Sequence, residues 1–181
     1  MAAAASRPIR PKQLARQIGG WANAQQIPRV KIKIGESGAD PGRDLSRMRQ
    51  ARQVIGDDVE LFVDANGAYS RKQAIRVLNA AADLDVRWVE EPVSSDDLAG
   101  LREIRDAVCA DVTAGEYGFD LYYFQRMRRA EAVDCLQIDA SRCGGITEWI
   151  RAAAVAASHG LEVSGRCGPH LHAHVAAATP N

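Results

Sequence analysis

The stretch RVKIKIG (residues 29–35) decides the fold when it is read together with LFVDANGAY (61–69) and WVEEPV (88–93). Each stretch contains a short apolar run of strand-forming residues that ends in charged side chains. Such runs recur at steps of 24–30 residues, at 30–34, 61–63, 86–89, 111–114, 135–138 and 161–163. Between them, apolar residues return at helical spacing, over 44–55, 70–84, 96–108, 121–129 and 147–159. This alternation predicts βα units and a parallel sheet.

Two architectures fit this alternation of strands and helices. A closed (β/α) barrel needs eight strands, and the sequence shows six, which indicates an incomplete barrel of TIM type with outer helices. An open doubly wound sheet is the alternative. No GxGxxG or GxxxxGK[ST] motif follows the first strand, which weakens a nucleotide-binding version of that sheet. The local pattern alone leaves both open.

Composition sets the class of protein. The chain has 181 residues, 46% of them hydrophobic and 25% charged, as expected for one soluble globular domain. Its formal net charge is zero, so we expect neither nucleic acid nor a membrane surface as partner. No apolar run approaches the ~18 residues of a membrane-spanning helix. The four cysteines have no framework spacing, which predicts reduced thiols in the cytoplasm. We expect residues 1–12 to form a loose leader and 13–181 one domain.

Charged side chains follow the end of every predicted strand, where (β/α) folds place their chemistry. Lys31 and Lys33 are two residues apart, and therefore on the same face of the first strand. The later strands end in or lead into Asp64, Glu90, Glu116, Asp139 and Arg166.

Three of these acids suggest a common purpose. Asp64, Glu90 and Glu116 stand 26 residues apart, as side chains converging from consecutive strands would. Carboxylates brought together in a partly dry cavity repel one another, and either take up protons or collect a cation. A set of oxygen ligands suits Mg²⁺, while zinc is not expected because His and Cys are absent from the set. The paired lysines suggest proton abstraction, since an ammonium close to another ammonium and to a metal ion has its pKa lowered.

The order and spacing of six motifs resemble a known family. RVKIKIG, LFVDANGAY, WVEEPVSSDDLAGL, AGEYG, LQIDASRCGGITEW and HLHAHVAAATPN are similar to the barrel of mandelate racemase and muconate lactonizing enzyme-like members of the enolase superfamily, closest to acid-sugar dehydratases. The resemblance runs from about residue 13 to residue 181.

The resemblance implies a role for each of the following residues. Asp64, Glu90 and Glu116 would bind Mg²⁺. Lys33 would remove the proton α to the substrate carboxylate, with Lys31 lowering the pKa of Lys33 and touching that carboxylate. Asn66 would contact substrate oxygens, and Asp139 would belong to an Asp–His dyad on the opposite face of the substrate.

This sequence departs from the family pattern in three places. The N-terminal capping domain and the first barrel strand are expected to be missing, and the last strand as well. Arg166 stands where the dyad histidine belongs, and an arginine stays protonated in proteins. We therefore expect Arg166 to form an ion pair with Asp139 and to anchor substrate. His170 is a possible displaced dyad histidine.

These features predict a Mg²⁺-dependent lyase that dehydrates a sugar acid, a small-molecule carboxylate. A racemase of the same branch is less favoured, because racemisation needs a second base. A truncated, catalytically silent relative is the other alternative. We expect a homo-oligomer.

Overall fold

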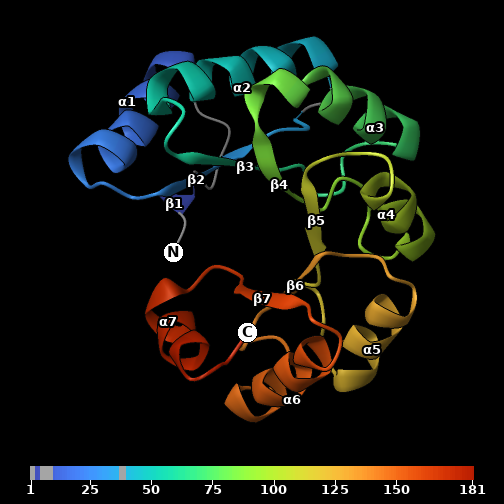
Figure 1. Ribbon diagram of the computed structural model, residues 1–181. Helices are drawn as coiled ribbons and strands as arrows, with labels where there is room; N and C mark the ends of the chain where they lie inside the picture. Colours follow the sequence, from blue (N-terminus) through green and yellow to red (C-terminus); the bar gives the residue numbers. More distant parts are fainter. Residues whose placement is uncertain (1–2, 5–9, 37–39) are drawn as a thin grey trace.

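The computed structural model describes residues 3–4, 10–36 and 40–181. One parallel sheet runs through these residues, and its strands follow one another in sequence order without a reversal. This order excludes the doubly wound alternative and confirms the incomplete barrel (Figure 1). The strands are β1 (Ala3–Ala4), β2 (Arg29–Lys33), β3 (Glu60–Asp64), β4 (Val86–Glu90), β5 (Asp111–Ala114), β6 (Cys135–Ile138) and β7 (Glu162–Gly165).

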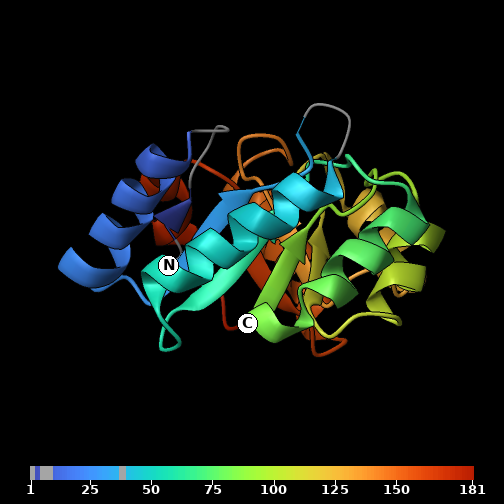
Figure 2. The same cartoon turned by 90° about the horizontal axis from the view of Figure 1, so that it is seen from above.

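Helices cover the outer side of the curled sheet (Figures 1 and 2). They are α1 (Pro11–Gly19), α2 (Pro41–Ile55), α3 (Arg71–Ala80), α4 (Leu98–Arg105), α5 (Leu121–Arg129), α6 (Ile146–Ala157) and α7 (Pro169–Ala177), with short turns η1 (Gly20–Ala24) and η2 (Ala82–Leu84). The described strands curve into an incomplete ring that has β1 at one end and β7 at the other, and the C-terminus lies beside the opening (Figure 1). None of the helices in the described part of the chain is long and apolar enough to span a membrane.

Local sequence explains where the helices begin and end. At the start of α2, Asp40 Oδ1 accepts hydrogen bonds from the backbone N–H groups of Gly42 (3.0 Å) and Arg43 (3.2 Å), which stabilises an N-terminus that also has proline in its first turn. Gly56, with φ of 73°, ends the helix in the left-handed region. Asp97 and Asp120 cap α4 and α5 in the same way as Asp40 caps α2.

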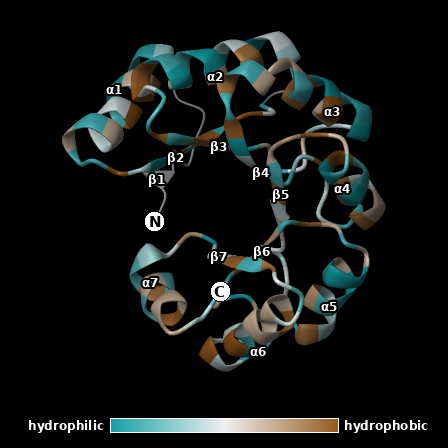
Figure 3. Cartoon of the chain, in the orientation of Figure 1, coloured by the Kyte–Doolittle hydropathy of each residue, from teal (hydrophilic) through white to brown (hydrophobic). Residues whose placement is uncertain are grey.

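The core lies between the strands and the inner faces of the helices (Figure 3). On β2, Val30 and Ile32 are completely buried, while Lys31 and Lys33 occupy the alternate face and reach acids inside the ring. Level with Lys31 along the strands, the aromatic side chains of Phe62 and Trp88 stack with centroids 5.1 Å apart. Because side chains alternate along a strand, β2 directs its apolar residues to the core and its two lysines to the interior of the ring.

Two sequence expectations need correction. The six predicted strands match β2–β7, but the first barrel strand is present: Ala3 and Ala4 pair in parallel with Val30 and Lys31. This pairing lies inside the expected leader, of which residues 1–2 and 5–9 are outside the described residues. Two alanines have too little apolar pattern to mark a strand. Helices α1 and α7 were not predicted either.

Candidate active site

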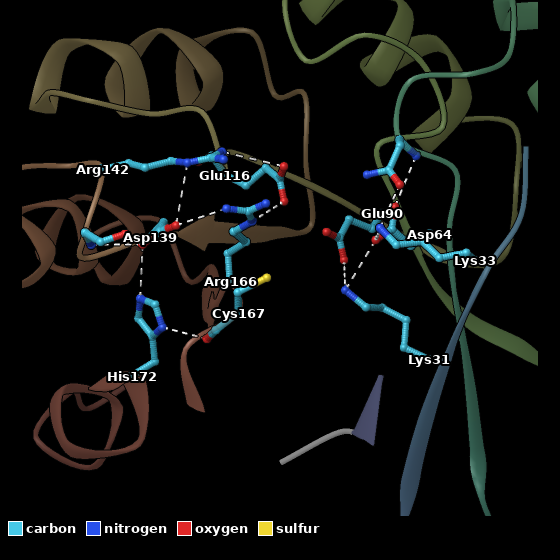
Figure 4. Close-up of polar contacts among 12 residues, drawn as sticks. Lys31, Lys33, Asp64, Glu90, Glu116, Asp139, Arg142, Arg166, Cys167 and His172 are labelled. Atoms are coloured by element: carbon cyan, nitrogen blue, oxygen red, sulfur yellow. Dashed lines mark hydrogen bonds and ion pairs between the residues drawn. The ribbon is translucent and has the colours of Figure 1, made fainter. Parts of the chain in front are cut away.

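The ring opens into a mouth at the carboxyl ends of its strands. On one side of this mouth, lysines and acids from β2, β3 and β4 contact one another (Figure 4). Lys31 Nζ forms a short ion pair with Glu90 and lies 3.5 Å from Asp64 Oδ2. Lys33 Nζ forms a short ion pair with Asp64 and donates to Asn66 Oδ1 at 2.7 Å. Both lysine side chains are partly exposed, at 17% and 21%, whereas Asp64 and Glu90 are buried. The two lysine side chains thus keep some contact with solvent, whereas the acids that they pair with are buried.

The charge of Lys31 is fixed by its surroundings. Burial alone would lower its pKa, but Glu90 and Asp64 together outweigh burial and raise it. The acids beside Lys31 thus act on its pKa in the direction opposite to a neighbouring ammonium and a metal ion, and the expected lowering of the pKa of the base by those two stays a prediction. The aromatic face of Trp88, with its centroid 5.5 Å from Nζ, adds to the stabilisation of the cation. Lys31 stays an ammonium.

On the other side of the mouth, the acids pair with arginines and not with lysines. Arg166, which follows β7, donates from Nε to Glu116 at 2.9 Å and from Nη1 to Asp139 at 3.4 Å. Arg142 lies 3.6 Å from Glu116 and 3.7 Å from Asp139. The expected contact between Arg166 and Asp139 is confirmed, and Arg166 also binds Glu116, which the sequence did not predict.

The three acids expected to bind Mg²⁺ do share one edge of the sheet, and all are buried, at 1%, 1% and 4% exposure for Asp64, Glu90 and Glu116. They do not form one cluster: within residues 3–4, 10–36 and 40–181 no three acid, histidine or cysteine side chains lie close enough to hold one ion. The predicted convergence is therefore wrong for this structure. The reason is that Lys31 and Lys33 draw two of the acids to one side, while the arginines draw Glu116 to the other (Figure 4).

The chemistry of these donors nevertheless fits Mg²⁺. Asp64 and Glu90 at the ends of β3 and β4, and Glu116 just after β5, offer buried carboxylate oxygens, which is the ligand type that this hard cation takes. Burial, together with the neighbouring Asp64, raises the pKa of Glu90 against the opposing attraction of Lys31. A cation would relieve the repulsion among the acids.

The histidine beside Asp139 is His172, not His170. His170 is exposed on α7, whereas His172 is buried and its Nε2 lies 3.5 Å from Asp139 Oδ1. The Nε2 atom accepts the backbone N–H of Ala140 at 2.9 Å, and Nδ1 lies 2.8 Å from the Cys167 carbonyl, which can only accept. These two bonds fix His172 as the neutral tautomer with its proton on Nδ1.

Sequence reasoning missed His172 although a signal was present. His172 and Val175 are three residues apart and form the buried face of α7. The helix approaches β7 closely because residue 165 is glycine: a Cβ atom there would lie 2.8 Å from the Cβ atom of His172. Asn66, which has φ of 46°, holds Lys33 as described, and its expected contact with substrate remains a prediction.

The sequence matches the family described as enolase C-terminal domain-like over residues 13–181. It is 29% identical over 151 residues to L-talarate/galactarate dehydratase of Salmonella typhimurium, covering 83% of this chain and 37% of that protein. It is 34% identical over 157 residues to L-Ala-D/L-Glu epimerase of Clostridium acetobutylicum, covering 82% and 43%.

Solved structures give the same result. A racemase from Streptomyces coelicolor with bound magnesium superposes with a TM-score of 0.93 at 29% identity, covering 99% of this chain and 50% of that one. The chain thus spans about half the length of that structure, and less than half of the two curated relatives. The relatives are enzymes of the enolase superfamily, and the chain belongs to its C-terminal domain-like family.

Proposed function

We propose that this protein removes the proton α to the carboxylate of a small acid in a Mg²⁺-dependent reaction, and that it thereby dehydrates a sugar acid. The observation that carries the proposal is the placement of Lys31 and Lys33 on the inner face of β2, with their tips beside two buried acids. The similarity to a sugar-acid dehydratase supports the reaction class.

Each side chain has a distinct part in the proposed reaction. Lys33 takes the α proton onto Nζ, and Asn66 and Asp64 hold that nitrogen in place. Lys31 remains charged and attracts the substrate carboxylate. The C–H electron pair then forms a C=C bond as the β C–O bond breaks, the β hydroxyl leaves as water with the proton that Lys33 took up, and the resulting enol tautomerises to a 2-keto-3-deoxy acid.

The metal would be held by Asp64, Glu90 and Glu116, whose donor chemistry fits Mg²⁺. When bound, Mg²⁺ supplies electrostatic stabilisation for the negative charge that develops on the substrate carboxylate. Magnesium in the S. coelicolor racemase structure supports this choice of cation.

Racemisation or epimerisation is the second candidate, favoured by the similarity to the L-Ala-D/L-Glu epimerase. It needs a group that delivers a proton to the opposite face of the substrate. There, Arg166 stays protonated and His172 already accepts the N–H of Ala140. The second face therefore has no free base among these residues, which favours dehydration.

The test is to incubate the protein with Mg²⁺ and a panel of sugar acids in D₂O. Exchange of the α proton with formation of a 2-keto-3-deoxy acid supports the proposal. Exchange with inversion and no elimination would support the racemase. Magnesium binding without exchange on any acid would contradict both, and would favour a catalytically silent relative.

Partners and location belong to the same proposal. We propose a small carboxylate as the partner, a homo-oligomer as the assembly and the cytoplasm as the location. All four cysteines are free thiols, as a reducing compartment requires. Exposed apolar side chains on α6, Ile146 at 59% and Ile150 at 42%, support contact with another copy.

A further inference from the structure

A buried polar cluster contacts the backbone of the proposed base at the N-terminal end of α2. Its members are Asp44, Arg47 and Tyr69, and all three are buried. Asp44 and Arg47 are three residues apart in α2, whereas Tyr69 lies in the loop between β3 and α3. Burial of a carboxylate and a guanidinium is unfavourable unless both are paired and hydrogen-bonded. The chemistry proposed above uses none of these side chains, so their burial needs another reason.

The first two turns of α2 hold the backbone from which the side chain of Lys33 extends. The carbonyl of Lys33 accepts a hydrogen bond from Arg47 Nε at 2.8 Å. Two residues further on, the backbone N–H of Gly35 donates to Asp44 Oδ2 at 3.1 Å. The end of β2 is thus tied to the helix on both sides of Ile34.

Tyr69 joins this backbone to the loop that follows β3. Its hydroxyl donates to the same oxygen, Asp44 Oδ2, at 2.5 Å. Burial, and then the hydrogen bond to Asp44, raise the pKa of Tyr69 above its ordinary value, so Tyr69 stays a hydroxyl donor. Its backbone N–H bonds to the Pro92 carbonyl at 3.3 Å, in the loop after β4. Asp44 Oδ2 is therefore the point at which α2 and the loops after β2 and β3 are joined.

These two loops also approach each other closely beside Lys33. Gly35 has φ of 75°, and a Cβ atom there would lie 2.7 Å from the Cβ atom of Ala68 and 2.9 Å from the carbonyl oxygen of Ala65. Between these alanines lies Asn66, whose Oδ1 accepts a hydrogen bond from Lys33 Nζ at 2.7 Å. A shift of Gly35 relative to the loop after β3 would therefore change the separation between Lys33 and Asn66.

We propose that Asp44 and Tyr69 are positioning residues for Lys33, which hold the base and Asn66 at a fixed separation through their shared hydrogen bond. The inference rests on the proposed function, in which Lys33 takes the α proton. Proton transfer depends steeply on placement, since a displacement of about 1 Å can lower a rate about 100-fold. The two residues act through Lys33 and need no contact with the substrate.

The test is Tyr69→Phe, which removes one hydroxyl and keeps the aromatic ring. The order parameter of the Lys33 Nζ group, measured by ¹⁵N NMR without added ligand, should fall by about a third, from the range of rigid groups toward that of flexible ones. Exchange of the α proton is then measured with Mg²⁺ and with galactarate and gluconate as probes. It should slow about tenfold, while calorimetric affinity and stoichiometry for the same acid stay within about twofold of the wild-type values.

Ile55→Val, at the other end of α2, is the matched control. Ile55 is buried, and removal of one of its methylene groups weakens the fold by about as much as loss of one buried hydrogen bond. Urea unfolding checks that the two variants lose similar stability. The control should keep the order of Lys33 and the wild-type rate of exchange.

Unchanged order of Lys33 in Tyr69→Phe overturns the inference, as does an equal loss of order in Ile55→Val. A wild-type rate of exchange in Tyr69→Phe, or a slower rate explained by lower binding stoichiometry, also overturns it. Loss of order in Tyr69→Phe alone, with no exchange of either acid even in the wild-type protein, leaves the positioning role standing and contradicts the proposed function alone.

Discussion

The two sides of the ring mouth neutralise their buried acids with different cations. On the side built by β2, β3 and β4, lysines hold Asp64 and Glu90; on the side built by β5, β6 and β7, arginines hold Glu116 and Asp139 (Figure 4). A lysine can lose its proton when its surroundings change, whereas an arginine keeps it. Proton transfer is therefore expected from the lysine side, and fixed charge from the arginine side.

The largest effect is expected from Lys33→Met, which tests whether proton transfer depends on the lysine side of the mouth. The change keeps a side chain of similar length and removes the proposed base, so the rate of α-proton exchange should fall about 10³-fold. Exchange is followed by NMR in D₂O. Lys72→Met, on the outer face of α3, is the matched control and should exchange as the wild-type protein does. If exchange persists in Lys33→Met, the base is a residue other than Lys33.

Glu90→Gln tests whether the lysine side also holds the metal. The amide keeps the shape of the carboxyl but not its charge, and it leaves Lys31 with only Asp64 as a nearby acid. Affinity for Mg²⁺ should fall about 100-fold, since even partners outside the ligand shell cost 10–100-fold. Titration calorimetry with MgCl₂ measures it. Glu162→Gln at the start of β7 should not change the affinity; equal affinity in both variants would remove Glu90 from the ligand set.

Arg166→His tests whether a group that can exchange protons gives the arginine side of the mouth a part in proton transfer. A histidine beside Asp139 can take and return a proton, so the variant should gain inversion of the α carbon, about tenfold above the wild-type background. Chiral chromatography of a 2-hydroxy acid after incubation measures it. Arg76→His on α3 is the control. If inversion does not appear, Arg166 is not what prevents chemistry on the second face.

The smallest effect concerns stability. Burial opposes ionisation of Asp139, but hydrogen bonds from Ser141 and Arg166 hold the pKa of Asp139 below its usual 3.8. Its stabilising contribution is thus present above the usual value and lost as pH falls through the lower folded-state pKa. Asp139→Asn should cost about 1 kcal/mol at pH 7 in urea unfolding, and the cost should shrink toward pH 3. Asp58→Asn, at an exposed position, is the control; a cost independent of pH would contradict an ionic role.

The sequence predicted strand order and strand ends well, because both follow from alternation and spacing. It placed Lys31 and Lys33 on one face correctly, since a period of two leaves no other choice. The sequence did not predict which ion pairs the side chains form. Equal spacing placed Asp64, Glu90 and Glu116 at one edge of the sheet, but it did not show that Arg166 would bind Glu116 and hold it away from the other two acids. Helix geometry decides between His170 and His172, two residues apart and therefore on different faces.

The last two strands of the ring differ in burial, which has a consequence for local opening. All four residues of β6 are buried, and none of β7 is. Amide hydrogens of β7 should therefore exchange with solvent earlier than those of β6. Arg166 follows β7, and its backbone N–H is bonded to the Ile138 carbonyl at 3.0 Å. The fixed charge opposite the lysines thus depends on the more easily opened of these two strands, so a brief local opening of β7 would change the electrostatics of the mouth while β6 stays in place.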